Sequence, residues 1–524
     1  MEHAPSGYAT VSVAAILAET AARLPEKTAL IVGEQSISYR ALWQQTLTYA
    51  GALRDRGVTP GQAVAILIPN VPDFPRAYYA ILALGGIVVP IHALLKAEEI
   101  AFVLKDSGST LLISAAPLLG EGAKGAALAG VDVLTLMMPP HSNDESLDAV
   151  GFDRLEDLAA EAVALETYVA RAPEDTATIL YTSGTTGHPK GAEGSHFSLV
   201  EQTSTLLLGT FDMSSDDVLL GCLPLFHTFG QTCVLNTGIR AGATIVLMPK
   251  FDGAGAIELI TQHGCTIFFG VPTMYMVILA AAGTEPIETD LRYGVSGGAA
   301  IPVAIIERFT QVFGVDIHEG YGLTETSPVA SFNRRGVAPR PGTIGTPIWG
   351  VDVEIARAEV DEAIELLPRG ELGELVIRGH NLMKGYLHRD DDTQRSVVDG
   401  WFRTGDLGTK DDDGYLRILD RKKDMILRNG YNVYPREVEE VLAGHPDVSM
   451  AAVYGIAHEV HGQEVVAAVV LSPSATATAP ELVEFAKEHV AAYKYPREVA
   501  IVDALPMGPS GKVLKRELVA RHGA

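Results

Sequence analysis

Apolar runs alternate with amphipathic stretches over the first part of the chain. The runs "TALIV" (28–32) and "AVAILI" (63–68) are continuously apolar, as strands buried on both faces are. Between them, residues 39–56 carry apolar side chains at helical spacing, as do residues 11–24. Strand and helix patterns continue to alternate to about residue 315. This alternation predicts parallel sheets covered by helices, which is an α/β fold.

The pattern changes twice more towards the C-terminus. From about residue 340, short strands such as "GELVIRG" and "GYLRILDR" are separated by Gly and Asp turns, which predicts a small β-rich unit. After Lys423, a helix, two strands and another helix follow, which predicts a small α+β domain of about a hundred residues. A chain of 524 residues is also too long for one compact core, so at least two domains are expected.

Composition and charge exclude several classes of protein. The 40 basic and 65 acidic residues give a net charge of −25, which argues against a nucleic-acid partner. The three cysteines show no CxxC spacing, so we expect a reduced, cytoplasmic chain with neither disulfides nor a zinc site. No transmembrane segment, signal peptide or peroxisomal address is predicted. Peripheral contact with a membrane and a homodimer both stay open.

The stretch "YTSGTTGHPKG" (181–191) follows a strand-like run and combines glycines, hydroxyls and Lys190. Glycines let backbone N–H groups approach an anion closely, and Ser and Thr hydroxyls add donors. A Walker loop requires Lys directly after Gly and then Ser or Thr, whereas Gly187 is followed by His-Pro-Lys-Gly. The stretch is therefore a phosphate loop of another kind or a Gly-rich surface loop.

Three further motifs offer groups that could act on a nucleotide. Glu325 in "HEGYGLTETSP" (318–328) is a candidate Mg²⁺ ligand, or else a turn cap. Asp406 in "WFRTGDLG" could accept bonds from ribose hydroxyls, or be a turn aspartate. Lys512 in "LPMGPSGKVLKREL" is a catalytic candidate, or a solvated surface charge. Each motif on its own leaves both interpretations open.

Together, the motifs TSGTTGxPKG, YGxTE, TGD, DRxKD and PxxxxGK occur in the order that resembles the adenylate-forming superfamily of acyl-CoA synthetases, luciferases and peptide-synthetase adenylation domains. The resemblance spans nearly the whole chain. It implies that a carboxylate attacks the α-phosphate of Mg·ATP to give an acyl-adenylate and pyrophosphate. A thiol, usually that of coenzyme A, then takes the acyl group and AMP leaves. ATP, Mg²⁺, coenzyme A and a small-molecule carboxylic acid are the implied ligands.

The resemblance also implies a domain organisation. A large N-terminal domain over 1–419 would contain two doubly wound α/β subdomains and a small β-barrel-like unit at about 340–419. A hinge at 420–423 would join it to a mobile α+β lid domain at 424–524. Rotation at Lys423 after the first half-reaction would remove Lys512 and bring the loop with Gly430 and Tyr431 to the thiol tunnel.

Roles for individual residues follow from the same resemblance. Lys512 would orient the carboxylate against the α-phosphate, because fixed cations offset the charge that gathers in the transition state. Thr182 and Glu325 would contact Mg²⁺, and Asp406 would bind the ribose with help from Arg421. The other implied nucleotide contacts are Ser183, Gly184, Thr185, Thr186, Gly187 and Lys190 at the β- and γ-phosphates, and Gly297, Gly298, Ala299, Glu319, Gly320, Tyr321, Gly322 and Thr324 around the adenine and α-phosphate.

The acyl pocket is expected at "PLFHTFGQTCVLN" (224–236), with His227 as its gate or, alternatively, as a core histidine. The stretch has no aspartate to pair an ammonium group, which disfavours amino-acid substrates. The apolar run "FFGVPTMYMVIL" (268–279) favours an apolar acyl chain. The similarity to bacterial medium- and long-chain fatty-acid CoA ligases is greatest. An aromatic-acid CoA ligase and a fatty acyl-AMP ligase that delivers to a carrier protein are the alternatives.

One histidine pair could form a metal site. His458 and His461 in "HEVHG" have a spacing that could share a metal ion. They lie in a loop between two expected strands, and no third ligand is apparent. We therefore do not expect a metal site there.

Overall fold

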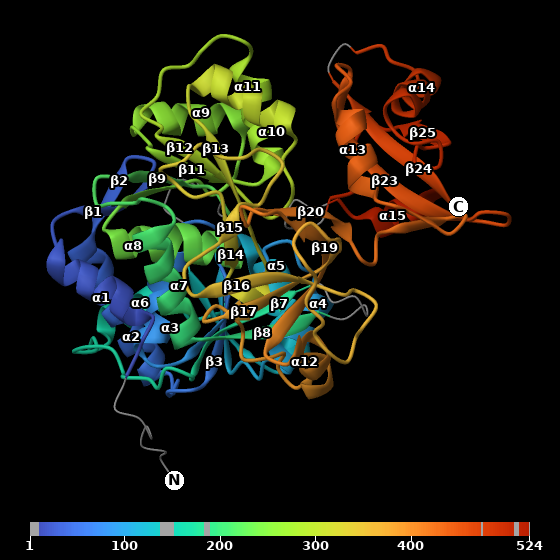
Figure 1. Ribbon diagram of the computed structural model, residues 1–524. Helices are drawn as coiled ribbons and strands as arrows, with labels where there is room; N and C mark the ends of the chain where they lie inside the picture. The colour runs from blue at the N-terminus through green and yellow to red at the C-terminus, as the bar shows by residue number, and fades with distance from the viewer. Residues whose placement is uncertain (1–9, 137–150, 183–188, 473–474, 508–512, 523–524) are drawn as a thin grey trace.

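Two lobes of unequal size make up the protein, as the computed structural model in Figure 1 shows. The structure describes residues 10–136, 151–182, 189–472, 475–507 and 513–522. The larger lobe contains two large sheets and a smaller antiparallel one, and the smaller lobe is formed by the C-terminal residues. The predicted α/β fold is confirmed.

The first large sheet has six strands in the order β6-β5-β3-β4-β7-β8. All neighbours are parallel except β7 and β8, which form an antiparallel pair. Its strands are β3 (Ala63–Leu67), β4 (Ile87–Pro90), β5 (Leu111–Ala115), β6 (Asp132–Leu136), β7 (Thr176–Thr182) and β8 (Lys190–Ser195). The helices of this part of the chain are α2 (Tyr39–Asp55), α3 (Asp73–Ala83), α4 (Ala97–Asp106), α5 (Leu119–Ala129) and α6 (Leu155–Glu161).

The second large sheet has nine strands in the order β15-β14-β13-β12-β11-β9-β10-β1-β2. Its strands are β1 (Thr28–Val32), β2 (Gln35–Ser38), β9 (Val218–Gly221), β10 (Thr244–Leu247), β11 (Ile267–Gly270), β12 (Tyr293–Ser296), β13 (Ile317–Gly322), β14 (Val329–Phe332) and β15 (Thr346–Pro347). Its helices are α1 (Ala14–Arg23), α7 (His196–Gly209), the π-helix η3 (Phe229–Asn236), α8 (Thr237–Ala241), α9 (Gly253–Gln262), α10 (Pro272–Ala282) and α11 (Val303–Phe313). Consecutive apolar runs thus enter different sheets, because β1 pairs with β10 and not with β3.

The two large sheets share one hydrophobic core. Hydrogen bonds from the first sheet's part of the chain fix the segment that runs from the end of β9 to the end of η3. The Tyr79 hydroxyl donates to Asn236 Oδ1 at 2.8 Å, and Asn236 Nδ2 donates to the Tyr78 hydroxyl at 3.1 Å. Asn70, which precedes α3, donates to the Leu223 carbonyl at 2.7 Å. The first subdomain therefore holds both ends of the segment in which the acyl pocket is expected.

A five-stranded antiparallel sheet follows, with the order β16-β17-β19-β18 and with β20 also paired to β19. Its elements are β16 (Val351–Ala356), β17 (Gly373–Gly379), α12 (Asp390–Ser396), β18 (Val397–Val398), β19 (Trp401–Lys410) and β20 (Leu416–Arg421). This unit is the small β-rich part that the sequence predicts after residue 340.

The smaller lobe contains β21 (Ile426–Arg428), β22 (Tyr431–Val433), α13 (Pro435–Ala443), β23 (Val448–His458), β24 (Gly462–Leu471), α14 (Ala479–His489), β25 (Glu498–Ile501) and α15 (Lys515–His522). It has hydrophobic clusters of its own, which include Ile426, Val438, Leu442, Val465 and Leu482. Within the described residues, no hydrophobic cluster joins this lobe to the larger one. Among those same residues, no helix is both long enough and apolar enough to cross a bilayer.

Candidate active site

The phosphate-loop motif lies between the paired strands β7 and β8. Thr182, the last residue of β7, pairs with Lys190, the first residue of β8. The predicted contacts Ser183, Gly184, Thr185, Thr186 and Gly187 fall outside the described residues. The pairing nevertheless shows that Thr182 and Lys190, the described residues near the two ends of the motif, lie opposite each other on neighbouring strands.

The Lys190 side chain is half-buried and has two neighbours from further along the chain. Its Nζ lies 3.2 Å from Asp392 Oδ1 and 5.0 Å from the centre of the Tyr386 ring. An ammonium over an aromatic face is attracted by the ring quadrupole, and the carboxylate adds a full charge. Lys190 is thus held in place on the side of β8 that faces α12.

Glu325 lies in the short 3₁₀ helix η4 (Thr324–Thr326) and is buried. The Tyr386 hydroxyl donates to its Oε1 at 2.8 Å. This bond links Glu325 through one side chain to Lys190, and so to the position of Thr182. A carboxylate and a hydroxyl are the hard oxygen donors that Mg²⁺ prefers, so the chemistry of this pair fits the ion.

Asp406 lies on β19, directly opposite Arg421 of β20. Its Oδ2 accepts from the Tyr321 hydroxyl at 2.5 Å, and its Oδ1 lies 3.2 Å from Arg421 Nε. Burial, and then the charge of Asp406, raise the pKa of Tyr321, so the phenol stays protonated as a donor. The structure therefore brings together three of the residues predicted for the ribose and adenine region. A buried, oriented carboxylate of this kind can accept further bonds from vicinal hydroxyls.

The glycine-rich turns of β12 and β13 border the same region. A Cβ on Gly322 would lie 1.7 Å from the Pro328 carbonyl oxygen, so no other residue fits there. Gly298 has a φ of +83° and is exposed together with Ala299, which leaves backbone groups open after β12. Gly320 precedes Tyr321 on β13, and Gly297 lies close to it, because a Cβ on Gly297 would lie 3.6 Å from the Gly320 carbonyl oxygen.

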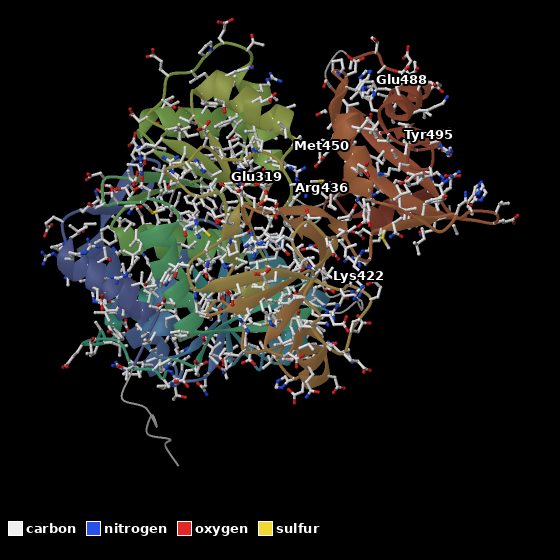
Figure 2. All side chains as sticks on the ribbon, in the orientation of Figure 1. Glu319, Lys422, Arg436, Met450, Glu488 and Tyr495 are labelled. Atoms are coloured by element: carbon white, nitrogen blue, oxygen red, sulfur yellow. The ribbon has the colours of Figure 1, made fainter. Side chains whose placement is uncertain are left out.

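Glu319, in the middle of β13, departs from this pattern of paired groups. Its Oε2 is buried and has no hydrogen-bond partner among the described residues. Burial raises the pKa of Glu319 to about 7, and the positive charge of Arg436 opposes that shift. Arg436 belongs to α13 of the smaller lobe, and Figure 2 shows the two side chains at the junction of the lobes.

The expected acyl stretch meets the nucleotide motifs at Phe229. A Cβ on Gly297 would lie 3.2 Å from the Phe229 ring, so the start of η3 borders the turn after β12. His227 is half-buried, and its Nδ1 accepts from the Phe229 N–H at 3.2 Å. The helix η3 has π-type turns, which are rare and frequently occur at functional sites.

Buried polar atoms gather on η3 and on α7, which packs against it. Gln231 is fully buried, and neither its Nε2 nor its Oε1 has a hydrogen-bond partner among the described residues. Four further side chains of these two segments are buried with an oxygen that lacks a partner: Gln202, Thr205, Thr228 and Thr232. Buried polar groups normally have a hydrogen-bond partner. Packing of the protein interior alone therefore does not account for these polar side chains.

Two family profiles match the chain. The one described as AMP-binding enzyme matches residues 17–387, and the one described as AMP-binding enzyme C-terminal domain matches residues 437–512. The chain belongs to the AMP-binding enzymes.

Relatives resemble this AMP-binding enzyme over nearly their whole lengths. A long-chain-fatty-acid–CoA ligase of Bacillus subtilis is 33% identical, over 96% of this chain and 93% of its own. A feruloyl-CoA synthase of Amycolatopsis sp is 35% identical, over 95% of this chain and 96% of its own. The crystal structure of ATP-bound MatB from Rhodopseudomonas palustris has a TM-score of 0.88 at 30% identity, over 97% and 99% of the two chains. The predicted membership of the acyl-CoA synthetase branch of the adenylate-forming superfamily, and the predicted use of ATP, Mg²⁺ and coenzyme A, are confirmed.

The smaller lobe of this AMP-binding enzyme carries the remaining predicted residues. Lys512 lies outside the described residues. Lys423 is exposed, whereas its neighbour Lys422 donates to the Ala358 carbonyl of the larger lobe at 2.6 Å. Gly430 lies in the β21–β22 turn, and Tyr431, the first residue of β22, is 57% exposed.

A second set of polar bonds joins the lobes through Arg436. Its Nη1 donates to the Ile418 carbonyl at 2.9 Å, and its backbone N–H donates to Asp420 Oδ2 at 2.9 Å. Both acceptors belong to β20, at the edge of the larger lobe. These bonds and those of Lys422 lie on either side of the expected hinge.

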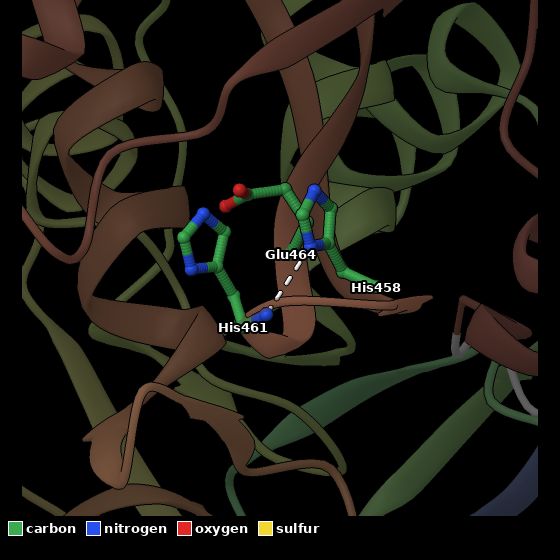
Figure 3. A group of neighbouring side chains, drawn as sticks. All are labelled: His458, His461 and Glu464. Carbon is green, nitrogen blue, oxygen red and sulfur yellow. Dashed lines mark hydrogen bonds between the residues drawn. The ribbon is translucent and has the colours of Figure 1, made fainter.

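The histidine pair does have a third neighbour, so the sequence-based expectation was wrong on that point. Candidate ligand atoms of His458, His461 and Glu464 lie within 4.8 Å of one another (Figure 3). However, both Glu464 oxygens are bonded to Arg428, at 2.5 and 3.1 Å. The two imidazole rings are stacked 4.5 Å apart at 17°. A metal must lie in the plane of each ligating ring, and nearly parallel stacked rings share no such point.

Sequence reasoning missed Tyr386, Asp392 and Gln231 of this enzyme. Tyr386 and Asp392 occur in "KGYLHRDDD", where three consecutive aspartates are typical of an exposed helix start. Gln231 lies inside the expected acyl stretch, which we interpreted from its lack of an acidic residue. The sequence signal for Gln231 is an amide within an otherwise mostly apolar run.

Proposed function

We propose that this AMP-binding enzyme activates a medium- or long-chain fatty acid and transfers it to coenzyme A. A carboxylate oxygen of the acid forms a bond to the α-phosphorus of ATP, and the bond to the β-phosphate bridging oxygen breaks, which releases pyrophosphate. The thiol sulfur of coenzyme A then bonds to the acyl carbon, the bond to the AMP oxygen breaks, and the thiol proton leaves. The products are acyl-CoA and AMP.

The observation that carries the proposal is the grouping of charged side chains around one set of strand ends. Lys190 lies over the ring of Tyr386, and Glu325 accepts from its hydroxyl. Asp406 is bonded to Tyr321 on the strand that leads to Glu325. Lys190 supplies a cation for the leaving pyrophosphate, Glu325 and Thr182 supply oxygens for Mg²⁺, and Asp406 supplies an acceptor for the ribose. Positive charge at the α-phosphate and the acid comes from Lys512. Mg²⁺, when bound, offsets charge on the phosphate oxygens.

A fatty acid is favoured by the apolar α10 and by the Bacillus relative, whose name states a long-chain fatty acid. A second candidate is an aromatic acid that carries a hydrogen-bonding substituent. It is favoured by the unpaired amide of Gln231 and by the relative named feruloyl-CoA synthase. A substrate hydroxyl or carbonyl would satisfy a buried amide, whereas an alkyl chain would leave it without a partner.

Pyrophosphate release tests the reaction and the acid together. Purified enzyme is incubated with ATP and Mg²⁺ and with straight-chain or ring-substituted aromatic acids, with and without coenzyme A. Acyl-CoA and AMP should form in equal amounts with the preferred acid. If adenylate accumulates and coenzyme A is not consumed, the acceptor is a carrier protein instead. If ATP binds but no acid yields pyrophosphate, the ligase proposal is wrong.

The Lys512→Ala variant tests the division into two half-reactions. It should abolish adenylate formation, because the cation at the α-phosphate is lost. It should still convert a supplied acyl-adenylate to acyl-CoA, because Lys512 has no part in the second step. Equal loss of both half-reactions would contradict the proposed division.

A further inference from the structure

A segment of the larger lobe, residues 383–392, joins the phosphate-loop strand to the helix that carries Glu325. The Lys384 N–H donates to the Glu193 carbonyl at 2.8 Å, and the Leu387 N–H donates to the Gly191 carbonyl at 2.8 Å. On its other side, the Met383 N–H donates to the Glu325 carbonyl at 2.9 Å. These backbone bonds fix the segment between β8 and η4.

Tyr386 lies in the middle of this segment and is buried. Its hydroxyl donates to Glu325 Oε1 at 2.8 Å, while the ammonium of Lys190 lies 5.0 Å from the centre of its ring. Its own N–H donates to Thr393 Oγ1 at 2.8 Å, which fixes its backbone to α12. One side chain thus touches both the lysine expected at the phosphates and the carboxylate expected at the metal.

The two contacts of Tyr386 have different chemistry. The ring face attracts the ammonium whether or not the hydroxyl is present. The hydroxyl occupies one carboxylate oxygen of Glu325, which limits rotation of the carboxylate. Asp392 holds Lys190 from its other side at 3.2 Å.

We propose that Tyr386 is a positioning residue that orients the Glu325 carboxylate towards the metal of Mg·ATP. Mg²⁺ demands near-octahedral geometry, so the direction of a carboxylate ligand matters as much as its presence. Groups that hydrogen-bond a metal ligand typically change metal affinity by 10- to 100-fold when they are removed. The inference rests on the proposed function, because that proposal assigns Glu325 to the metal.

The Tyr386→Phe variant separates the two contacts, because it keeps the ring under Lys190 and removes only the hydroxyl. Mn²⁺ serves as the probe and is titrated into enzyme saturated with a non-hydrolysable ATP analogue, with free Mn²⁺ followed by electron paramagnetic resonance. We expect Mn²⁺ affinity to fall by roughly 10-fold or more. Binding of the analogue in EDTA should stay unchanged, since Lys190 retains its contacts.

Tyr49→Phe is the matched control. The Tyr49 hydroxyl also donates to a buried carboxylate, Asp73 Oδ1 at 3.0 Å, but between helices α2 and α3. Both variants lose one tyrosine–carboxylate bond and should lose similar thermal stability. Only Tyr386→Phe should change Mn²⁺ affinity, and an equal change in both variants would overturn the inference.

A double-mutant cycle shows whether Tyr386 acts through Glu325. In a Glu325→Gln background, Tyr386→Phe should change Mn²⁺ affinity by no more than about twofold, because the group that it orients is gone. Undiminished loss in that background, or unchanged Mn²⁺ affinity in the single variant, would overturn the inference. The titration does not depend on turnover. Failure of the ligase proposal would appear instead as wild-type enzyme that releases no pyrophosphate with any acid.

Discussion

The nucleotide side and the acyl side of the site differ in how their polar groups are satisfied. On the nucleotide side, Asp406 is bonded to Tyr321 and Arg421, and Glu325 is bonded to Tyr386. On the acyl side, Gln231 is fully buried with both amide atoms unpaired among the described residues. The two sides meet where Phe229 lies against Gly297.

This difference affects how each side can bind its ligand. The bonded groups on the nucleotide side are already held in one geometry, which lowers the reorganisation needed in the reaction. A buried amide without a partner is costly, so a substrate group or an ordered water that satisfies it contributes to binding. Under the proposed function, the unpaired groups of η3 and α7 would therefore contribute to the choice of acid.

The largest expected effect comes from Asp406→Asn, which would remove a charged acceptor from the nucleotide side. An amide cannot accept on both atoms, so a bond to Tyr321, to Arg421 or to the ribose is lost. We expect kcat/KM for ATP to fall about 100- to 1000-fold, as the loss of one or two bonds to a charged group implies. Pyrophosphate release at varied ATP measures the loss.

The exposed Asp412→Asn, in the neighbouring hairpin, is the control and should leave kcat/KM for ATP unchanged. The KM for the acid should change little in either variant. An equal rise in the KM for the acid in Asp406→Asn would mean that the two sides are not separable as described.

A smaller effect is expected from Gln231→Leu on the acyl side. For acids with a hydrogen-bonding substituent, kcat/KM should fall about 10- to 100-fold, because the amide that would bind the substituent is lost. For unsubstituted fatty acids it should stay constant or rise, since Leu removes an unpaired buried group. Pyrophosphate release with paired substituted and unsubstituted acids gives the ratio.

Gln262→Leu, on the exposed face of α9, controls for the general effect of the substitution. A uniform loss with both kinds of acid in Gln231→Leu would show a packing role for Gln231 and no part in the choice of acid.

The remaining effect is on stability and concerns Glu319, the carboxyl on the nucleotide side that keeps an unpaired oxygen. Its pKa is about 7 in the folded protein, against an ordinary value of 4.5. Between these pH values the folded state holds a proton that the unfolded state has lost, so stability falls as pH rises and is constant above the folded pKa. The full loss is about 3 kcal/mol.

Glu319→Gln removes this titration. The melting temperature of the variant, relative to wild type, should rise by a few degrees between about pH 5 and about pH 8. Glu307→Gln on α11, where the side chain is exposed, should show no such rise. A constant difference between Glu319→Gln and wild type across this range would contradict the assignment.

The sequence could predict the α/β fold and the motif residues because both depend on short-range patterns. Asp406 and Glu325 occur in motifs whose order along the chain resembles one superfamily. Tyr386 could not be found in that way, since its role depends on residues 383–387 pairing with β8, nearly two hundred residues earlier. Another long-range pairing, that of β1 with β10, sends "TALIV" into the nine-stranded sheet.

The separate core of the smaller lobe has a consequence for motion. No hydrophobic cluster of the described residues crosses between the lobes, so the turn of the smaller lobe that the family resemblance implies would divide none of these clusters. Among the bonds described above, such a turn at Lys423 would break those of Arg436 to Ile418 and Asp420. Each of these bonds involves a charged group and contributes about 1.5 to 3 kcal/mol, and water can form hydrogen bonds to the freed groups. Reorientation of this lobe is thus an exchange of hydrogen bonds, with a free-energy difference small enough for a bound ligand to decide its direction.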